Sequence, residues 1–227
     1  MPRSEHKFFI NKLDQLTIRS RLKLLMKPDP YAGPDGTYVI RSIYFDNFDD
    51  KELYEKAAGV SMREKWRIRY YNGDTSVIKL ERKTKRNNRY YKKSQRITLE
   101  QAQALLAGEN DFLLEGDNPF FHEFHAKLEA QALKPRTIVE YTREAYVYSP
   151  GKIRINFDTD IKTGLSSVRF FDPNVPLVSA IDSRGIVLEV KYGGYFPDHL
   201  SKALWSGTRL AEAISKYEYA RAFEFTK

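Results

Sequence analysis

The sequence predicts an α+β domain in which eight antiparallel strands, enough to close a barrel, carry helices packed on the outside. Most of the chain consists of short segments in which apolar and charged residues alternate, and this is the period of a β-strand. Asn72-Gly73 separates two such segments, and Asn-Gly is the strongest short-range signal for a β-hairpin. Helical patterns are few and are inserted between groups of strands.

The strands are assigned from this alternation. In chain order, the predicted strands are Glu5–Ile10, Tyr38–Asp46, Arg63–Tyr71, Ser76–Lys85, Lys92–Ile97, Arg136–Tyr148, Ile153–Ile161 and Gly185–Tyr192.

The helices are assigned from apolar spacing and from their first turns. Asn11–Met26 has leucines near helical spacing, and Leu99–Leu106 follows Thr98, a residue typical of a helix N-terminus. Asn118–Leu133 begins with Pro119, which suits the first position of a helix. His199–Trp205 and Leu210–Phe223 complete the set.

One face of each predicted strand carries long charged side chains. In Ser76–Arg86 the odd positions are Lys79, Glu81, Lys83 and Lys85, with Ile78 and Leu80 between them. The same pattern recurs in four other predicted strands. The residues that share a face are Lys65, Arg67 and Arg69 in the first; Tyr141 and Arg143 in the second; Arg154, Asn156, Asp158 and Asp160 in the third; and Glu189 and Lys191 in the fourth.

Two interpretations of this charged face compete. In many antiparallel sheets the charged face meets water and the apolar face meets the core. A solvated face, however, usually mixes both signs of charge, whereas Arg and Lys predominate here. If the sheet closes with this face inward, it encloses a basic tunnel. Because buried like charges are costly, such a tunnel needs a polyanion such as polyphosphate to neutralise it.

The overall composition restricts the function classes. The chain has 227 residues, no Cys, and 38 Lys and Arg against 30 Asp and Glu, a formal charge of +8. Disulfides and cysteine-ligated metals are excluded, and the charge favours an anionic partner. No apolar run reaches the roughly 20 residues that span a bilayer. The N-terminus lacks the features of a signal peptide, so we expect a cytoplasmic protein.

A few carboxylates stand among the cations. Divalent cations accompany phosphate chains and prefer oxygen ligands, and Glu189 is the best candidate to hold one. Asp158 and Asp160 are weaker candidates, and Glu81 could instead hold the neighbouring lysines by ion pairing. The four histidines, including His122 and His125 at helical spacing, form no convincing ligand set.

Nine ordered motifs resemble the VTC catalytic domain, a family of polyphosphate polymerases within the triphosphate tunnel metalloenzyme fold. They cover nearly the whole chain as a single domain, residues 1–227, and are EHKF, SIYFDN, KWRIRYY, LERKTK, KKSQRI, PRTIVEYTREAY, IRINFDTDI, LEVKY and ISKYEYA. The sequence departs from the Glu-x-Glu-x-Lys opening of the wider fold. Arg3 takes the first position, which weakens the case for metal binding by this strand.

The resemblance assigns roles to residues that match these motifs. It implies phosphate binding by Lys7, Arg67, Arg69, Lys83, Lys93, Tyr141, Arg143, Arg154, Lys191, Ser215 and Lys216, with Lys92 and Arg96 competing for the place of Lys93. Among them Arg67, Arg69, Lys83, Arg143, Arg154 and Lys216 would act at the transferred group. Glu189 matches the metal-binding glutamate, and the metal would be Mn²⁺ or Mg²⁺.

The implied activity is transfer of the terminal phosphoryl group of ATP to a growing polyphosphate chain. An inorganic triphosphatase of the same fold and a non-catalytic polyphosphate or nucleotide sensor remain as alternatives. RNA binding would require aromatic residues beside the basic ones, whereas Trp66 and Tyr70 alternate onto the other face, so we expect no nucleic-acid partner. Eukaryotic relatives carry membrane helices that this chain lacks, so coupling to transport would need a separate membrane partner.

Overall fold

A single antiparallel sheet forms the centre of the protein. The structure is a computed structural model and describes residues 4–86, 89–181, 185–205 and 210–225. The main strands follow the order β1-β10-β8-β7-β3-β4-β5-β6. Their bounds are β1 (Ser4–Ile10), β3 (Thr37–Asp46), β4 (Met62–Tyr71), β5 (Asp74–Arg86), β6 (Arg89–Ile97), β7 (Lys134–Tyr148), β8 (Ile153–Thr163) and β10 (Ile186–Tyr192). All eight predicted strands are present.

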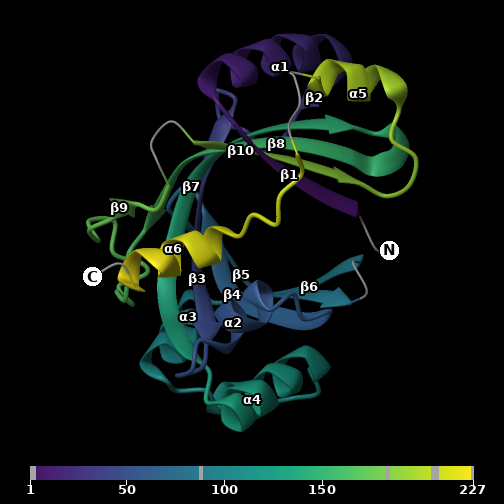
Figure 1. Cartoon of the computed structure of the whole chain (residues 1–227). Coiled ribbons are helices and arrows are strands. Elements are labelled where there is room, and N and C mark those ends of the chain that lie inside the picture. The colour runs from purple at the N-terminus through teal and green to yellow at the C-terminus, as the bar shows by residue number, and fades with distance from the viewer. Residues whose placement is uncertain (1–3, 87–88, 182–184, 206–209, 226–227) are drawn as a thin grey trace.

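Two short strands that the sequence did not predict extend the sheet to ten. β2 (Lys27–Pro28) pairs with β7, and β9 (Val178–Ser179) pairs with β8. Figure 1 shows β1, β8 and β10 in the upper part of the molecule and β4, β5 and β6 in the lower part, with the long strands β3 and β7 joining them. The sheet is therefore strongly curved, and one of its faces is concave.

The strands form the predicted tunnel-like architecture, but the sheet does not close into a complete barrel. β1 and β6 are the two ends of the strand order, and no ladder pairs them in the described part of the chain. A side-chain contact spans the gap instead: Lys83 on β5, the neighbour of β6, donates to both carboxylate oxygens of Glu5 on β1 at 2.8 Å. The result is a tunnel-like open sheet.

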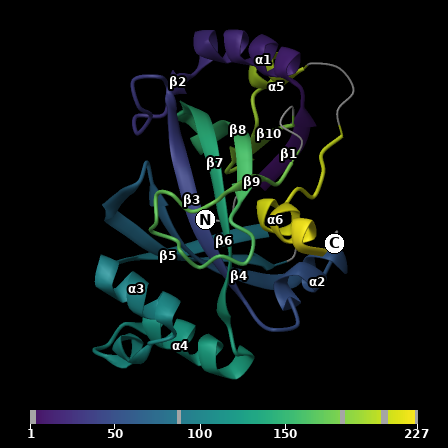
Figure 2. The same ribbon diagram turned by 90° about the vertical axis from the view of Figure 1, so that its left-hand side faces the viewer.

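Helices surround the sheet, as the sequence predicts. They are α1 (Lys12–Leu25), α2 (Lys51–Ala57), α3 (Leu99–Ala107), α4 (Pro119–Gln131), α5 (Asp198–Leu204) and α6 (Lys216–Phe225), with 3₁₀ turns η1 (Asp111–Leu114) and η2 (Pro150–Lys152). The convex face is covered by α1 and α5 at one end and by α3 and α4 at the other, whereas α2 and α6 contribute Lys56 and Lys216 to the concave side. Figure 2 shows α1 and α5 at one end of the molecule and α3 and α4 at the other. None of the described helices has both the length and the apolar content needed to cross a bilayer.

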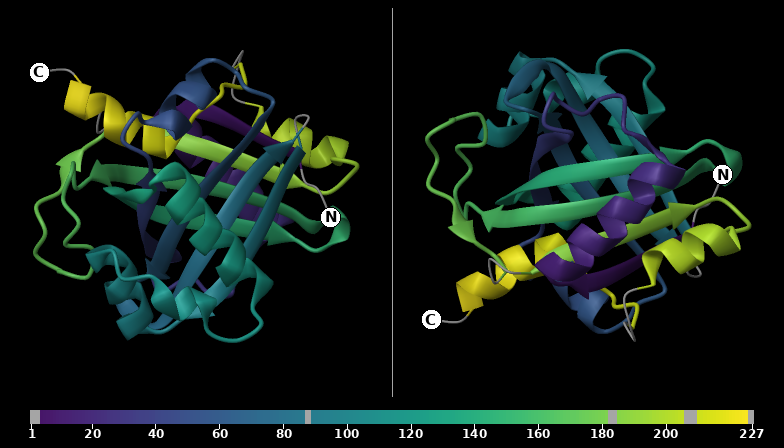
Figure 3. Two further views of the ribbon diagram at one scale, coloured as in Figure 1. Left: turned by 90° about the horizontal axis from the view of Figure 1, so that it is seen from below. Right: turned by 90° about the horizontal axis from the view of Figure 1, so that it is seen from above.

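The apolar face of each strand packs beneath these helices. Ile18 and Leu22 of α1 lie in one cluster with Ile155 of β8 and Leu188 of β10. Trp66 of β4 stacks on Phe124 of α4, with ring centroids 4.6 Å apart. Figure 3 shows the two helical layers, α1 and α5 above the sheet and α3 and α4 below it. Because the apolar face of the sheet packs against these helices, the charged face lines the concave interior.

Two helices differ from the prediction. α2 was not predicted, and α6 begins at Lys216 rather than at Leu210. The segment before α6 bonds to β1 instead of to itself: Glu212 N donates to Lys7 O at 2.9 Å, and Lys7 Nζ donates to Ile214 O at 2.8 Å. These bonds hold the segment extended until Ser215, whose Oγ accepts from Glu218 N and caps the helix.

Candidate functional site

The concave face of the sheet encloses a cavity of about 1000 Å³. Among the described residues that line it, Lys and Arg outnumber Asp and Glu by fourteen to five. Every main strand contributes at least one lining side chain, and α6 contributes Lys216. The inward interpretation of the charged face is therefore confirmed.

The β4 and β5 wall holds an arginine pair around a buried carboxylate. Glu81 is 1% exposed, and it accepts from Arg67 at 2.7 Å and lies 3.9 Å from Arg69. Lys92 of β6 also pairs with Glu81. Arg69 donates to Ser42 at 2.8 Å. Glu81 therefore orders the two arginines, although the sequence suggested that it would hold lysines of its own strand.

A second cluster lies on β7, β8 and β10. Arg143 donates to both oxygens of Asp158, at 2.6 and 2.7 Å, and to Glu189 at 3.1 Å. Lys216 reaches Asp158 at 2.5 Å, and its Nζ lies 4.7 Å from the centre of the Tyr141 ring. The buried Asp158 thus fixes two cations, and within this cluster Glu189 is the carboxylate that lines the cavity.

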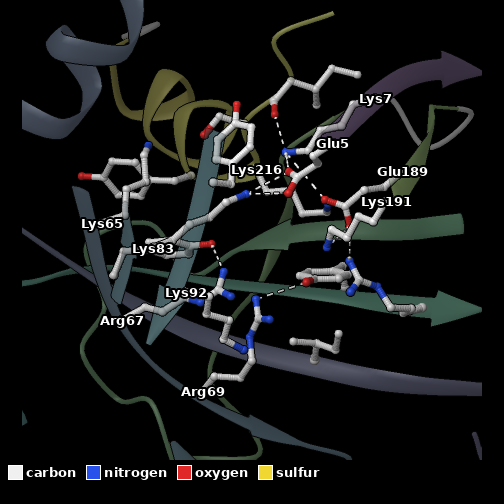
Figure 4. A pocket seen from close by; sticks show the side chains of 18 of the residues that line it. Glu5, Lys7, Lys65, Arg67, Arg69, Lys83, Lys92, Glu189, Lys191 and Lys216 are labelled. Carbon is white, nitrogen blue, oxygen red and sulfur yellow. Dashed lines mark hydrogen bonds and ion pairs between the residues drawn. The ribbon is translucent and has the colours of Figure 1, made fainter. Parts of the chain in front are cut away.

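The first strand brings a carboxylate to the same place. Lys7 Nζ lies 3.3 Å from Glu5 Oε1 and 3.9 Å from Glu189 Oε1, while Lys191 pairs with Glu189 at 2.9 Å. Figure 4 shows these four side chains together on the right of the cavity. Glu5 therefore contributes to the site, even though the sequence made a first-strand role in metal binding doubtful.

Arg154 adjoins the second cluster, because it donates to Asn156, which in turn donates to Glu189, and it lies in the wall that Asp29 and Tyr38 complete. It pairs with Asp29 and donates to the hydroxyl of Tyr38 at 2.5 Å. All three residues line the cavity. Asp29 and Tyr38 fall between the first and the second matched motif, so no motif pointed to their part in the site.

Most of the predicted site residues meet in this cavity. Lys7, Arg67, Arg69, Lys83, Tyr141, Arg143, Arg154, Glu189, Lys191, Ser215 and Lys216 all line it. Lys93 does not: it is exposed, and the neighbouring Lys92 lines the cavity in its place because alternation along β6 points the two side chains to opposite faces. Asp160, which the sequence placed on the same face as Arg154 and Asp158, does not line the cavity. Its φ is 51°, it lies where the pairing of β7 with β8 shifts register, and its side chain is exposed.

Several lining residues were missed. Lys56 lies on the unpredicted helix α2, so no pattern pointed to it. Arg63 shares the parity of Arg67 and Arg69 on β4, and this alternation was the available signal. Lys65 was placed on that charged face from the sequence but was given no role in the site. Tyr44 lies at the corresponding inward position of β3, opposite Arg67 in the ladder.

Burial and mutual charge shift the pKa values of the lining groups. Burial alone would raise the pKa of Glu189, but Lys191, Arg143 and Lys7 hold it well below its usual range. Burial lowers the pKa of Lys83 to about 8, although Glu5 acts in the opposite direction. Burial would raise the pKa of Tyr44, but Arg67 and Arg69 lower it to about 7. The cavity thus favours negative charge, which is the property a polyphosphate site requires.

The chain is similar to known proteins in both sequence and structure. The model of the VTC domain matches residues 2–225. No curated protein matches the chain. Among solved structures, HpAC1 from Hippeastrum, whose dominant activity is that of a triphosphatase, has a TM-score of 0.55 at 12% identity, with 98% of this chain and 96% of that chain covered.

Two further structures show weaker similarity. A Bacillus halodurans protein named as a candidate adenylate cyclase has a TM-score of 0.48 at 14% identity, with 89% of this chain and 87% of that chain covered. The PH1819 protein of Pyrococcus horikoshii OT3 has a TM-score of 0.47 at 15% identity, with 95% and 96% covered. At these identities the similarity concerns the fold alone.

Proposed function

Because the chain belongs to the VTC domain family, we propose that it is a polyphosphate polymerase that uses ATP. The terminal phosphoryl group of ATP would pass to the end of a phosphate chain held in the cavity. The observation that carries this proposal is the enclosed cavity of about 1000 Å³ with its cationic lining. Phosphoryl transfer requires alignment and charge neutralisation more than covalent help from the protein, and such a lining supplies both.

The cations divide between orienting and neutralising roles. Arg67 and Arg69 are fixed by Glu81 and Ser42, so their planar groups are already oriented for phosphate oxygens. On the opposite wall Arg143 and Lys216 are fixed by Asp158. We propose that these four residues, with Lys83 and Arg154, contact the phosphoryl group that is transferred. The remainder of the bound phosphate chain would be contacted by Lys7, Lys92, Lys191, Tyr141 and Ser215.

The residues present fit a divalent cation held mainly by substrate. No cluster of three or more His, Asp or Glu side chains forms a complete metal site within the described residues. Mg²⁺ is usually bound by one or two carboxylates together with phosphate oxygens, and Glu189 with Glu5 provides that number. When bound, Mn²⁺ or Mg²⁺ would polarise the phosphoryl oxygens as a Lewis acid.

We place the reaction in the cytoplasm, with ATP and polyphosphate or triphosphate as the ligands and no nucleic acid. Eight tyrosines line the cavity, so aromatic residues do accompany the cations, contrary to the expectation from Trp66 and Tyr70. These tyrosines line the cavity and make cation–π contacts that help to orient the cations. The contact of Lys216 Nζ with the ring of Tyr141 is one example.

A second candidate function is inorganic triphosphatase activity. It is favoured by the Hippeastrum structure, which shares the fold and has triphosphatase as its dominant activity. The two functions differ in the acceptor, a phosphate chain in one and water in the other. Both would use the same cations and carboxylates.

Incubation of the protein with labelled ATP and Mn²⁺, followed by separation of the phosphate products by size, tests the proposal. We expect a ladder of long chains. Orthophosphate as the sole product from ATP or triphosphate would refute the polymerase and support the triphosphatase. Binding of triphosphate without any turnover would support a non-catalytic sensor.

A further inference from the structure

A row of three lysines crosses the sheet at the left of the cavity in Figure 4. In the ladders of β4, β5 and β6, Lys65 stands opposite Lys83, and Lys83 stands opposite Lys92. All three line the cavity. Like charges directly opposite each other on neighbouring strands are destabilising, so the row is costly unless each cation has a negative partner.

Two members of the row have close partners. Lys83 donates to both oxygens of Glu5 at 2.8 Å, and Lys92 pairs closely with Glu81. Lys65 is different. The nearest carboxylate oxygen is Oε2 of Glu52 on α2, at 4.0 Å, which is too long for a hydrogen bond.

Neither atom of the Lys65–Glu52 pair is satisfied. Lys65 Nζ and Glu52 Oε2 are both buried and lack a hydrogen-bond partner within the described residues. Lys65 Nζ lies 4.8 Å from the centre of the Tyr217 ring, a cation–π contact that leaves its three N–H donors unused. Burial also lowers the pKa of Lys65 and raises that of Glu52 to about 8, as expected for two poorly compensated groups.

A buried donor left without an acceptor is expensive. Such a cost is tolerated where a ligand supplies the missing acceptor, and the phosphate oxygens of the proposed substrate are of the right kind. Lys65 projects from β4 one inward position before Arg67, so a phosphate chain held by Arg67 needs to extend by only one step along the strand to reach it.

We propose that Lys65 is a phosphate-binding residue of this cavity, and that Glu52 positions it while the cavity is empty. The inference rests on the proposed function. It extends the phosphate site toward α2, where Lys56 and Arg63 also line the cavity. The competing explanation is structural: Lys65 and Glu52 would form an ion pair that ties α2 to β4.

The test measures binding of inorganic triphosphate by calorimetry without metal, together with the melting temperature of the empty protein. The variants are Lys65→Met, Lys65→Arg and Glu52→Gln. Lys127→Met is the matched control, because it also removes one positive charge. Lys127 forms an ion pair, at 2.7 Å, with Glu64, which lies on the opposite face of β4 from Lys65.

We expect Lys65→Met to weaken triphosphate binding about ten- to a hundredfold, as the loss of a charge-assisted hydrogen bond does. Lys65→Arg should keep most of the affinity, and Lys127→Met should stay within about twofold of wild type. The empty Lys65→Met protein should melt no lower than wild type, because the removed group is a buried cation without a hydrogen-bond partner among the described residues, and a neutral Glu52 loses little with it. Glu52→Gln should bind at least as well as wild type.

Equal affinity in Lys65→Met and Lys127→Met would overturn the inference. A lower melting temperature in both Lys65→Met and Glu52→Gln, with unchanged affinity, would do the same and establish the structural tie. A tenfold loss of affinity in Glu52→Gln would overturn the role given to Glu52. Wild-type protein that fails to bind triphosphate would refute the proposed function itself, whereas normal wild-type binding with no loss in Lys65→Met refutes only this inference.

Discussion

Replacement of Glu189 by Gln separates catalysis from binding in the proposed mechanism. In the wild-type protein Asn156 Nδ2 donates to the Glu189 carboxylate at 3.0 Å. The Gln amide keeps the shape of the side chain and can accept the same hydrogen bond, but it lacks the charge that a divalent cation needs. We expect turnover of ATP with Mn²⁺ or Mg²⁺ to be abolished. Binding of nucleotide without metal should be largely intact, because the surrounding cations remain.

The effect on stability follows from the partners of Glu189. Its carboxylate is 4% exposed and compensates Arg143 at 3.1 Å and Lys191 at 2.9 Å. Removing one partner of a buried ion pair costs roughly 3–5 kcal/mol, and we expect the low end because Arg143 keeps both of its bonds to Asp158. For a chain of this length, roughly 3 kcal/mol lowers the melting temperature by about 6–12 °C.

Three measurements check this prediction: product formation from labelled ATP with metal, calorimetric binding of ATP without metal, and thermal melting. Glu144→Gln is the matched control, since Glu144 pairs with Arg19 of α1 at 2.7 Å, outside the cavity. That variant should retain turnover. Full activity of Glu189→Gln at ordinary metal concentration would refute the metal site proposed here, and loss of nucleotide binding would refute the separation of roles.

Three further predictions follow from the site and the core. Lys83→Ala should melt lower when empty, because Glu5 loses the donor to both of its oxygens, and it should also lose much of the triphosphate-induced rise in melting temperature measured against its own empty form; an unchanged rise would remove Lys83 from the phosphate site. Triphosphate affinity should fall as the pH rises through about 8, where Lys83 and Lys92 lose their charge, and calorimetry should show a shallower fall in Lys83→Ala. Phe124→Ala, which empties a fully buried position beside Trp66, should cost about 3–5 kcal/mol in chemical denaturation and leave triphosphate affinity unchanged.

The fold was largely predictable because alternation along a strand is a local property. All eight main strands and the capped starts of α1 and α3 follow from neighbouring residues, and the structure has the capping boxes at Asn11 and Thr98. α2, a helix of seven residues, was not predicted. The start of α6 was misplaced because its preceding segment bonds to β1, more than 200 residues earlier in the chain.

Most of the candidate site was also predictable, since inward and outward positions alternate strictly where the ladder is regular. The prediction failed where that premise failed. A register shift with a positive φ turned Asp160 outward, and an ambiguous run of two lysines on β6 led to Lys93 instead of Lys92. The place of Glu5 beside Glu189 depends on how β1 pairs with β10, which the motif did not specify.

The sequence by itself determined which side chains share a face and that this face is basic, because both depend only on the two-residue period of the strand and on composition. Only the tertiary structure decided that the face is concave, that the sheet stays open between β1 and β6, and which carboxylate pairs with each cation. Those features depend on contacts between residues far apart in the chain. Arg143 with Asp158, Lys83 with Glu5, and Lys65 with Glu52 become neighbours only when the curved sheet brings their strands and α2 around one cavity.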